Sequence, residues 1–179
     1  MQWDYSYFFP AIVSDNHVTD WGKQPIKFRI DVASMGKLGF DIVASGLSER
    51  DRSFARQAVQ NYQDFKDIVW HGDQYRLLNP HENDLSSVMY VTADKSRAIQ
   101  INYLVNYREQ ISATERPVLL NGLDPQKKYT VKEINLYPGT ESTIPSGKIY
   151  SGDFLMKVGI NPDVNLNRTS VVLEVAEKK

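Results

Sequence analysis

Between Ser48 and Trp70, apolar side chains recur every three or four positions, and polar side chains occupy most of the positions between them. This spacing predicts an amphipathic helix of about six turns. The hydroxyl of Ser48 can accept a hydrogen bond from the backbone N–H of Asp51, whose charge favours the first turn, so we expect the helix to begin here. The apolar face consists of Phe54, Ala58, Tyr62, Phe65 and Val69.

The chain before this helix has a different pattern. Tyr5–Val13 is a nearly continuous run of apolar and aromatic residues. Such a run predicts a strand that is buried on both faces, as in a parallel sheet. The next stretch, Ser14–Lys23, is polar, and we interpret it as a loop.

Two patterns overlap between Pro25 and Gly36. Apolar residues at positions 26, 30 and 33 share one face of a helix, whereas those at 26, 28, 30 and 32 alternate as in a strand. We favour the helix, because Pro25 suits a helix start and Gly36 a helix end. A short strand over Leu38–Val43 follows, so the order strand, loop, helix, strand, helix describes consecutive β/α units.

After Gly72 the hydrophobic pattern changes to a period of two, which is typical of antiparallel strands. The clearest example is Ile99–Tyr107, where apolar and aromatic residues alternate with mostly polar ones. Several short strands at regular spacing predict an antiparallel β-sandwich. The other predicted elements are strands over Tyr75–Leu78, Ser87–Thr92, Lys128–Leu136 and Thr169–Ala176, and a short helical turn over Ser151–Val158.

These elements predict an α+β protein with two domains. Residues 1–70 hold two β/α units, and residues 71–179 hold the antiparallel β-sandwich. Two β/α units can neither close a parallel sheet nor bury both of its faces. The simplest interpretation is that residues 1–70 are the end of a larger α/β domain whose earlier strands are absent.

Composition limits the classes of partner and compartment. The chain has 179 residues, of which 41% are hydrophobic and 24% charged, as in globular proteins. The net charge of -1 gives no electrostatic reason to expect nucleic acid or an anionic membrane as a partner. We see no signal peptide and no apolar run of the ~20 residues that a transmembrane helix needs. There is no cysteine, and the compartment stays open.

The sequence shows no motif for a metal or a cofactor. His17, His71 and His81 are far apart along the chain, and no cysteine supports them, so we expect no metal site. A glycine-rich phosphate loop and a Gly-x-Ser-x-Gly nucleophile motif are both absent, and we expect no cofactor.

The predicted loop Ser14–Lys23 is the best candidate for a binding site. It follows a buried type of strand, at the end where α/β barrels place their substrate-contacting loops. Asn16, His17 and Trp21 offer the mixture that carbohydrate sites use, polar groups for hydroxyls and an aromatic face for the sugar ring. The alternative is a solvent-exposed connector with a half-buried Trp.

Several segments resemble the late barrel and C-terminal domain of glycoside hydrolase family 36 α-galactosidases. They follow one another in the order found in that family and together extend over nearly the whole chain. The segments are Asn16–Ile42, Gly72–Leu78, Gly122–Pro125 with Tyr129–Val131, and Tyr150–Asp153 with Leu155 and Met156.

The resemblance implies a role for each half of the chain. Residues 1–70 would be the last two β/α units of a (β/α)₈ barrel, and residues 71–179 the C-terminal β domain beside it. Family enzymes retain the anomeric configuration by using one Asp as nucleophile and a second as acid/base, with the two carboxyl groups about 5 Å apart. Neither of the two family motifs that carry them is present here.

Three positions depart from the family or only imitate it. Ser14-Asp15-Asn16 looks like the acid/base motif, but it aligns with a later family loop that carries an Asn-His pair, so Asp15 receives no catalytic role. Ile12 stands where many members have His. Trp21-Gly22-Lys23 replaces a run that resembles Thr-Gly-Arg.

We therefore favour the interpretation that the chain is the C-terminal portion of an α-galactosidase and is inactive alone. A galactoside or oligosaccharide would be its partner only through the parent barrel. A stand-alone carbohydrate-binding or accessory module is the alternative. In the absence of a barrel, the apolar run near the N-terminus needs a new partner. Residues 1–45 are therefore expected either to form a homo-oligomer or to fold back onto the rest of the chain.

Overall fold

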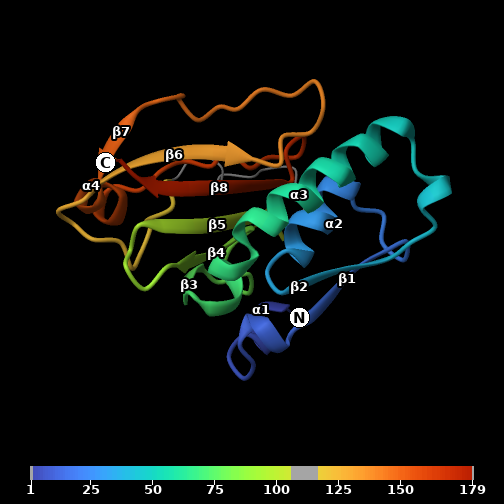
Figure 1. The fold of residues 1–179 in the computed structure, drawn as a ribbon, viewed down its shortest axis with the longest axis horizontal. Helices are drawn as coiled ribbons and strands as arrows, with labels where there is room; N and C mark the ends of the chain where they lie inside the picture. Colours follow the sequence, from blue (N-terminus) through green and yellow to red (C-terminus); the bar gives the residue numbers. More distant parts are fainter. Residues whose placement is uncertain (1, 106–116, 179) are drawn as a thin grey trace.

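The computed structural model describes residues 2–105 and 117–178, and it is an α+β fold (Figure 1). The first part of the chain supplies helices and a short parallel strand pair, and the second part supplies an antiparallel sheet. The elements of the first part are α1 (Gln2–Tyr5), η1 (Ala11–Val13), β1 (Asp15–Thr19), α2 (Ile26–Ala33), β2 (Lys37–Asp41), η2 (Ala44–Gly46) and α3 (Glu49–His71).

The prediction for the N-terminal stretch was wrong. Tyr5–Val13 is not a strand: Tyr5 ends α1, a turn follows, and Ala11–Val13 form η1. The first strand is β1, inside the predicted loop. A strand that is apolar on both faces needs partners on both of them, whereas Phe8 here is 80% exposed. Strand β1 forms because its residues alternate, with Asn16 and Val18 buried and their neighbours more exposed.

The remaining predicted elements of this part are present. Helix α2 lies where the helical pattern was favoured over the strand pattern, and β2 pairs in parallel with β1. Helix α3 begins after Ser48, whose hydroxyl accepts a hydrogen bond from the Asp51 backbone N–H at 3.1 Å. Its predicted apolar face is buried, from Phe54 to Val69.

The second part of the chain forms one six-stranded antiparallel sheet in the order β3-β4-β5-β8-β6-β7. The predicted end of the strand at Tyr107 lies outside the described residues. The elements are β3 (Asp73–Leu78), β4 (Leu85–Val91), β5 (Arg97–Leu104), β6 (Lys128–Ile134), β7 (Ile149–Ser151), α4 (Gly152–Lys157) and β8 (Ser170–Glu177).

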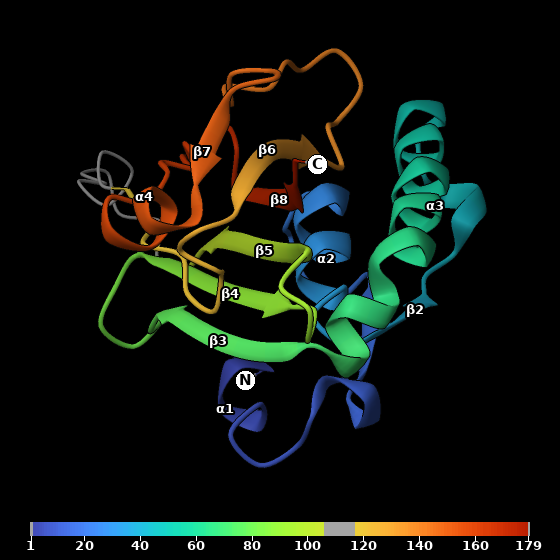
Figure 2. The same ribbon diagram turned by 60° about the vertical axis from the view of Figure 1, so that its left-hand side comes forward.

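The predicted β-sandwich requires a correction, because the antiparallel strands of the described residues form one sheet and not two facing sheets. Helices α2 and α3 lie against one face of the sheet, and α4 and the long connections lie on the other side (Figure 2). As a result, every residue of β4 is buried. The α+β class and the antiparallel arrangement are confirmed.

A buried carboxylate joins the two parts of the chain. Asp31 of α2 is fully buried and accepts hydrogen bonds from Lys27 Nζ (2.5 Å), Ser170 Oγ (2.7 Å) and Asn135 Nδ2 (2.9 Å). Ser170 begins β8, and Asn135 follows β6 with a left-handed backbone, φ = 56°. The side chain of Asn135 also accepts a hydrogen bond from Asn61 of α3, at 2.8 Å. This network fixes α2 and α3 against the sheet.

The turn between α2 and β2 is held by a tyrosine hydroxyl. Tyr62 of α3 donates to the carbonyl of Gly36 at 2.7 Å and accepts from the backbone N–H of Leu38 at 3.1 Å and from Trp70 Nε1 at 3.0 Å. Burial raises the pKa of the Tyr62 hydroxyl. The hydroxyl therefore stays neutral and can act as both donor and acceptor.

We expect Tyr62→Phe to lower the free energy of unfolding by about 1–3 kcal/mol, because three polar groups lose their partner. Urea unfolding followed by circular dichroism measures the change. Tyr75→Phe is the matched control, since the Tyr75 hydroxyl makes no hydrogen bond within the described residues. Equal effects of the two substitutions would contradict the assignment.

Candidate functional site

The structure separates the three predicted site residues into two places along β1. Asn16 and His17 lie in the first half of the strand, next to a hollow, while Trp21 follows the strand's last residue, Thr19. The two ends of a parallel strand are not equivalent, because α/β folds bind their ligands at the carboxyl ends of the strands. The two places therefore need separate consideration.

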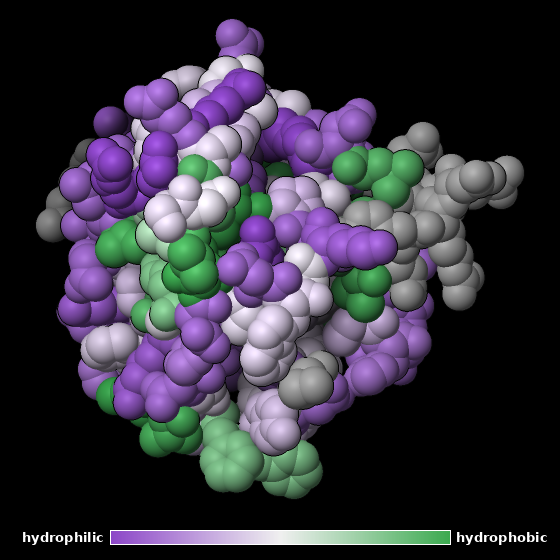
Figure 3. Space-filling view, turned by 90° about the vertical axis from the view of Figure 1, so that its right-hand side faces the viewer, coloured by the Kyte–Doolittle hydropathy of each residue, from purple (hydrophilic) through white to green (hydrophobic). Residues whose placement is uncertain are grey.

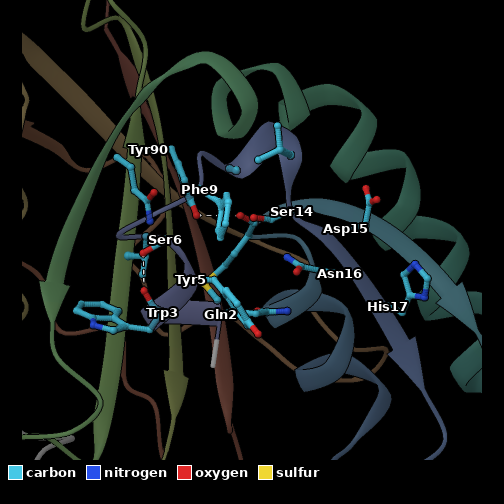
Figure 4. A pocket seen from close by; sticks show the side chains of 15 residues that line it. Gln2, Trp3, Tyr5, Ser6, Phe9, Ser14, Asp15, Asn16, His17 and Tyr90 are labelled. Atoms are coloured by element: carbon cyan, nitrogen blue, oxygen red, sulfur yellow. Dashed lines mark hydrogen bonds between the residues drawn. The ribbon is translucent and has the colours of Figure 1, made fainter.

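The hollow has a volume of about 430 Å³ and lies between the N-terminal segment, the start of β1 and strands β3 and β4. Figure 4 shows the rings of Tyr5 and Phe9 close together at its centre, whereas Asp15 and His17 lie further along β1. Thr19, Asp20 and Trp21 do not line it. The hollow thus belongs to the amino end of β1, which in a barrel contributes to stability and not to catalysis.

Asn16 has a structural role at this end. Its side chain is largely buried, and Nδ2 donates a hydrogen bond to the carbonyl of Ala33 at 3.1 Å, which satisfies the end of α2. The contact requires glycine at position 36, because a Cβ there would lie 2.6 Å from Asn16 Nδ2. The amide nitrogen of Asn16 is thus already engaged within the protein.

His17 lies on the outer face of β1, opposite Gly39 of β2. A Cβ at position 39 would lie 2.9 Å from His17 Cδ2, so the ring depends on the absence of a side chain there. This face continues with Asp15, which pairs with Lys37 across the two strands at 3.7 Å. The outer face of β1 and β2 is thus polar, in contrast to the buried face that contains Val18.

Trp21 lies just beyond the carboxyl end of β1 and is 90% exposed. Arg29 of α2 holds the backbone that leads to it, because its guanidinium donates to the carbonyl of Thr19 at 2.5 Å and to Asp20 Oδ1 at 3.3 Å. Asp20 and Asp15 each have a cationic partner, Arg29 at 3.3 Å and Lys37 at 3.7 Å. The arrangement can present an indole ring to a ligand.

Within the described ranges, no group of three or more His, Asp or Glu side chains could hold a metal ion. In those same ranges, none of the helices has the length and apolar character needed to cross a membrane. What the carboxyl end of β1 offers to a ligand is the exposed indole ring of Trp21.

A family model described as the glycosyl hydrolase family 36 C-terminal domain matches residues 85–174. The chain belongs to glycosyl hydrolase family 36. The matched residues extend from β4 to β8 and include most of the six-stranded sheet.

Relatives within this family are longer than the chain. The α-galactosidase AgaA of Geobacillus stearothermophilus is 32% identical over 119 residues, which is 65% of this chain but only 16% of the relative. The crystal structure of AgaB from the same organism superposes with a TM-score of 0.84 at 24% identity, covering 99% of this chain and 23% of its own. The structure of an AgaA variant in complex with stachyose superposes with a TM-score of 0.82 at 24% identity, and the match covers 99% of this chain and 24% of that chain. At this identity the superpositions show a shared fold.

Of the site residues predicted from the sequence, Asn16 and His17 are neighbours on β1 but face opposite sides of it, and Trp21 lies beyond the strand's carboxyl end, so the structure does not bring the three together. Sequence reasoning missed Arg29, which supports the turn before Trp21. Its only signal was a basic residue in the helix after the loop, and that signal does not distinguish a supporting Arg from a solvent-exposed one.

Proposed function

We propose that the chain is the C-terminal part of an α-galactosidase, a retaining glycoside hydrolase that cleaves terminal α-galactosides, and that it is inactive alone. Residues 1–70 would supply the last two β/α units of the catalytic barrel. Residues 71–179 would form the β domain that supports them. The galactoside or oligosaccharide would bind to the complete barrel.

The parallel pair β1–β2 is the observation that carries this proposal. It is the whole of its sheet within the described residues, so both of its outer edges lack a partner strand there. The order β1-α2-β2-α3 is that of two consecutive β/α units, and α2 and α3 cover only one face of the pair. A (β/α)₈ barrel provides a strand at each edge and a packed interior on the other face.

The carboxyl end of this pair is where we place the contribution to substrate binding. In a barrel that end faces the active site, so Trp21 would present its ring to the sugar and His17 would lie deeper along the same strand. Asn16 would act indirectly, by holding the end of α2. The stand-alone carbohydrate-binding module is not favoured, because it relied on a β-sandwich that the described strands do not form.

The experiment that tests the proposal is to determine the DNA sequence upstream of the Met1 codon. We expect the reading frame to continue into barrel strands that carry the two catalytic Asp motifs. A stop codon directly upstream would overturn the proposal. The purified chain should also hydrolyse an aryl α-galactoside no faster than buffer, and turnover that is lost in Asp15→Asn would equally overturn it.

A further inference from the structure

The turn that precedes β6 belongs to the face of the sheet that points away from α2 and α3. Leu120 and Leu123 in this turn are 2% and 3% exposed and pack in the hydrophobic cluster on that face. The N-terminal segment, where hydrophobic side chains protrude at the bottom of Figure 3, packs in a different cluster together with the helices. The earlier barrel units that we propose would adjoin β1 and β2, on the opposite side of the sheet from this turn.

Asn121 and Gly122 lie between the two buried leucines. Asn121 is exposed, and its Oδ1 accepts a hydrogen bond from the backbone N–H of Gly122 at 2.8 Å. The bond between Oδ1 and Cγ is about 1.23 Å long, so Cγ lies within about 4 Å of the Gly122 nitrogen. The side chain of Asn121 is thus folded over the peptide bond that follows it.

Gly122 leaves its backbone nitrogen accessible to that side chain. Its φ of +80° favours glycine, and a Cβ at this position would lie 2.3 Å from Tyr75 Cε2. Because there is no Cβ, no side chain of residue 122 separates the nitrogen from the Asn121 amide. Within the described residues, the Gly122 N–H also takes part in no backbone hydrogen bond, so loss of its proton breaks none.

This arrangement places a latent nucleophile next to an electrophile. A backbone nitrogen becomes nucleophilic when a base removes its proton, and the side-chain amide carbon of an asparagine is an acyl carbon that it can attack. Holding the two groups together in one turn makes the reaction intramolecular and so accelerates it. The exposure of Asn121 gives hydroxide and water access to the site.

From these observations we infer that Asn121 is a site of spontaneous deamidation, with the Gly122 nitrogen attacking Asn121 Cγ. Hydroxide removes the proton from that nitrogen, a bond forms between the nitrogen and Cγ, and the bond from Cγ to Nδ2 breaks. The amide nitrogen takes a proton from water and leaves as ammonia, which regenerates hydroxide. The product is a succinimide ring. The inference concerns these two residues and does not depend on the proposed function.

Water then opens the succinimide in one of two ways. Attack at Cγ breaks its bond to the Gly122 nitrogen and leaves aspartate, whereas attack at the backbone carbonyl carbon of residue 121 leaves isoaspartate. Overall, one water is consumed and one ammonia is released, and nothing is oxidised or reduced. Isoaspartate is the signature of this route, because direct hydrolysis of the side-chain amide gives aspartate alone.

The chain contains an internal control for the inference. Asn121 is the only asparagine in the 179-residue sequence that precedes glycine. Asn167 is also exposed and lies in a turn, but it precedes Arg168. The backbone N–H of Arg168 donates to the carbonyl of Asn165 at 3.0 Å, so this nitrogen is engaged in a backbone hydrogen bond. Asn167 therefore shares the exposure of Asn121 without its accessible nucleophile.

The modification would alter a turn whose two ends are fixed. The backbone N–H of Leu120 donates to the carbonyl of Leu155 at 3.0 Å, and that of Asp124 donates to the Tyr129 hydroxyl at 3.1 Å. Isoaspartate inserts a methylene group into the backbone between these anchors. The isoaspartate form should therefore unfold at a lower urea concentration than the unmodified chain.

Peptide mapping by mass spectrometry during incubation of the folded chain in mildly alkaline buffer tests the inference. We expect modification of Asn121 to be at least about tenfold faster than that of Asn167, because only Asn121 has an accessible nucleophile held beside it. An isoaspartyl methyltransferase should detect isoaspartate at position 121. Asn121→Gln is the matched variant, since its longer side chain moves the amide carbon away from the nitrogen and should abolish this signal.

Incubation in guanidinium chloride keeps the sequence and removes the turn. A rate at Asn121 in the folded chain that equals or exceeds the rate in denaturant supports the role given to the turn, and a much faster reaction in denaturant would overturn it. The inference also fails if Asn121 stays unmodified, if it yields aspartate without isoaspartate, or if Asn167 reacts equally fast.

Discussion

Asp31→Ala is expected to lower the free energy of unfolding by about 3–5 kcal/mol, because it removes the acceptor that three buried groups share. Lys27 would keep a largely buried ammonium group without a counter-charge, with its side chain only 15% exposed. Asn135 and Ser170 would each lose a buried hydrogen bond. Urea unfolding of the full chain measures the loss.

The chain contains a matched control for this prediction. Lys157 and Asp153 form a second ion pair four residues apart in a helix, at 2.7 Å, but both side chains are at least half exposed. Asp153→Ala should therefore change stability by no more than about 1 kcal/mol. Asp31→Asn keeps the shape and an acceptor for Asn135, and its loss should lie between the two. Similar losses for Asp31→Ala and Asp153→Ala would refute the role of burial.

Arg168→Met is expected to have a comparable effect, a loss of about 3–5 kcal/mol. Arg168 donates from Nη2 to both carboxylate oxygens of Glu133, at 2.8 and 2.9 Å. The Glu133 side chain is only 1% exposed, so the substitution would leave a buried carboxylate without its cation. Chemical unfolding at neutral pH gives the magnitude.

Two further variants separate this effect from a general loss of packing. Arg97→Met breaks a more exposed pair with Glu174 and should cost about 0–1 kcal/mol. Adding Glu133→Leu to Arg168→Met removes the unpaired charge and should recover much of the stability. If the double variant is no more stable than Arg168→Met, the unpaired carboxylate is not the cause.

The sequence predicted best those elements whose buried face is set by local periodicity. Helix α3 has an apolar residue every three or four positions and a capping Ser48, so its type and start follow from neighbouring residues alone. Most of the antiparallel strands could likewise be recognised from their period of two. Side-chain direction in a regular element depends only on the backbone, and this makes such predictions possible.

Polar residues within the sheet show where periodicity is insufficient. Gln100 and Asn102 alternate with apolar residues and would normally face solvent, yet both are fully buried. Their side chains bond to each other at 3.0 Å and to Ser87 of β4, at 3.1 Å from Gln100 and 2.7 Å from Asn102. A cover on the second face of the sheet buries them. The pattern of one strand cannot show that cover. The β-sandwich was predicted from the regular spacing of short strands, and that spacing does not tell whether they form one sheet or two.

The candidate site was predictable in composition but not in arrangement. A polar loop with Asn16, His17 and Trp21 could be recognised, but the alternation that makes its first half a strand was hidden by its polar composition. That Asn16 bonds to Ala33, 17 residues later, depends on how α2 packs. The distinction between the two ends of β1 requires the direction of the strand.

By itself, the sequence determined the α+β class, the main helices, most of the antiparallel strands and the family resemblance, because these depend on local spacing and on residue identity. The tertiary structure alone decided which surfaces are covered. It buries Asp31 between Lys27 of its own helix and groups from two distant segments, Asn135 and Ser170, and it leaves Phe8 in solvent, the reverse of what their polarity suggests. Burial depends on which segments meet in space, and for Asp31 the decisive partner, Ser170, lies 139 residues away along the chain.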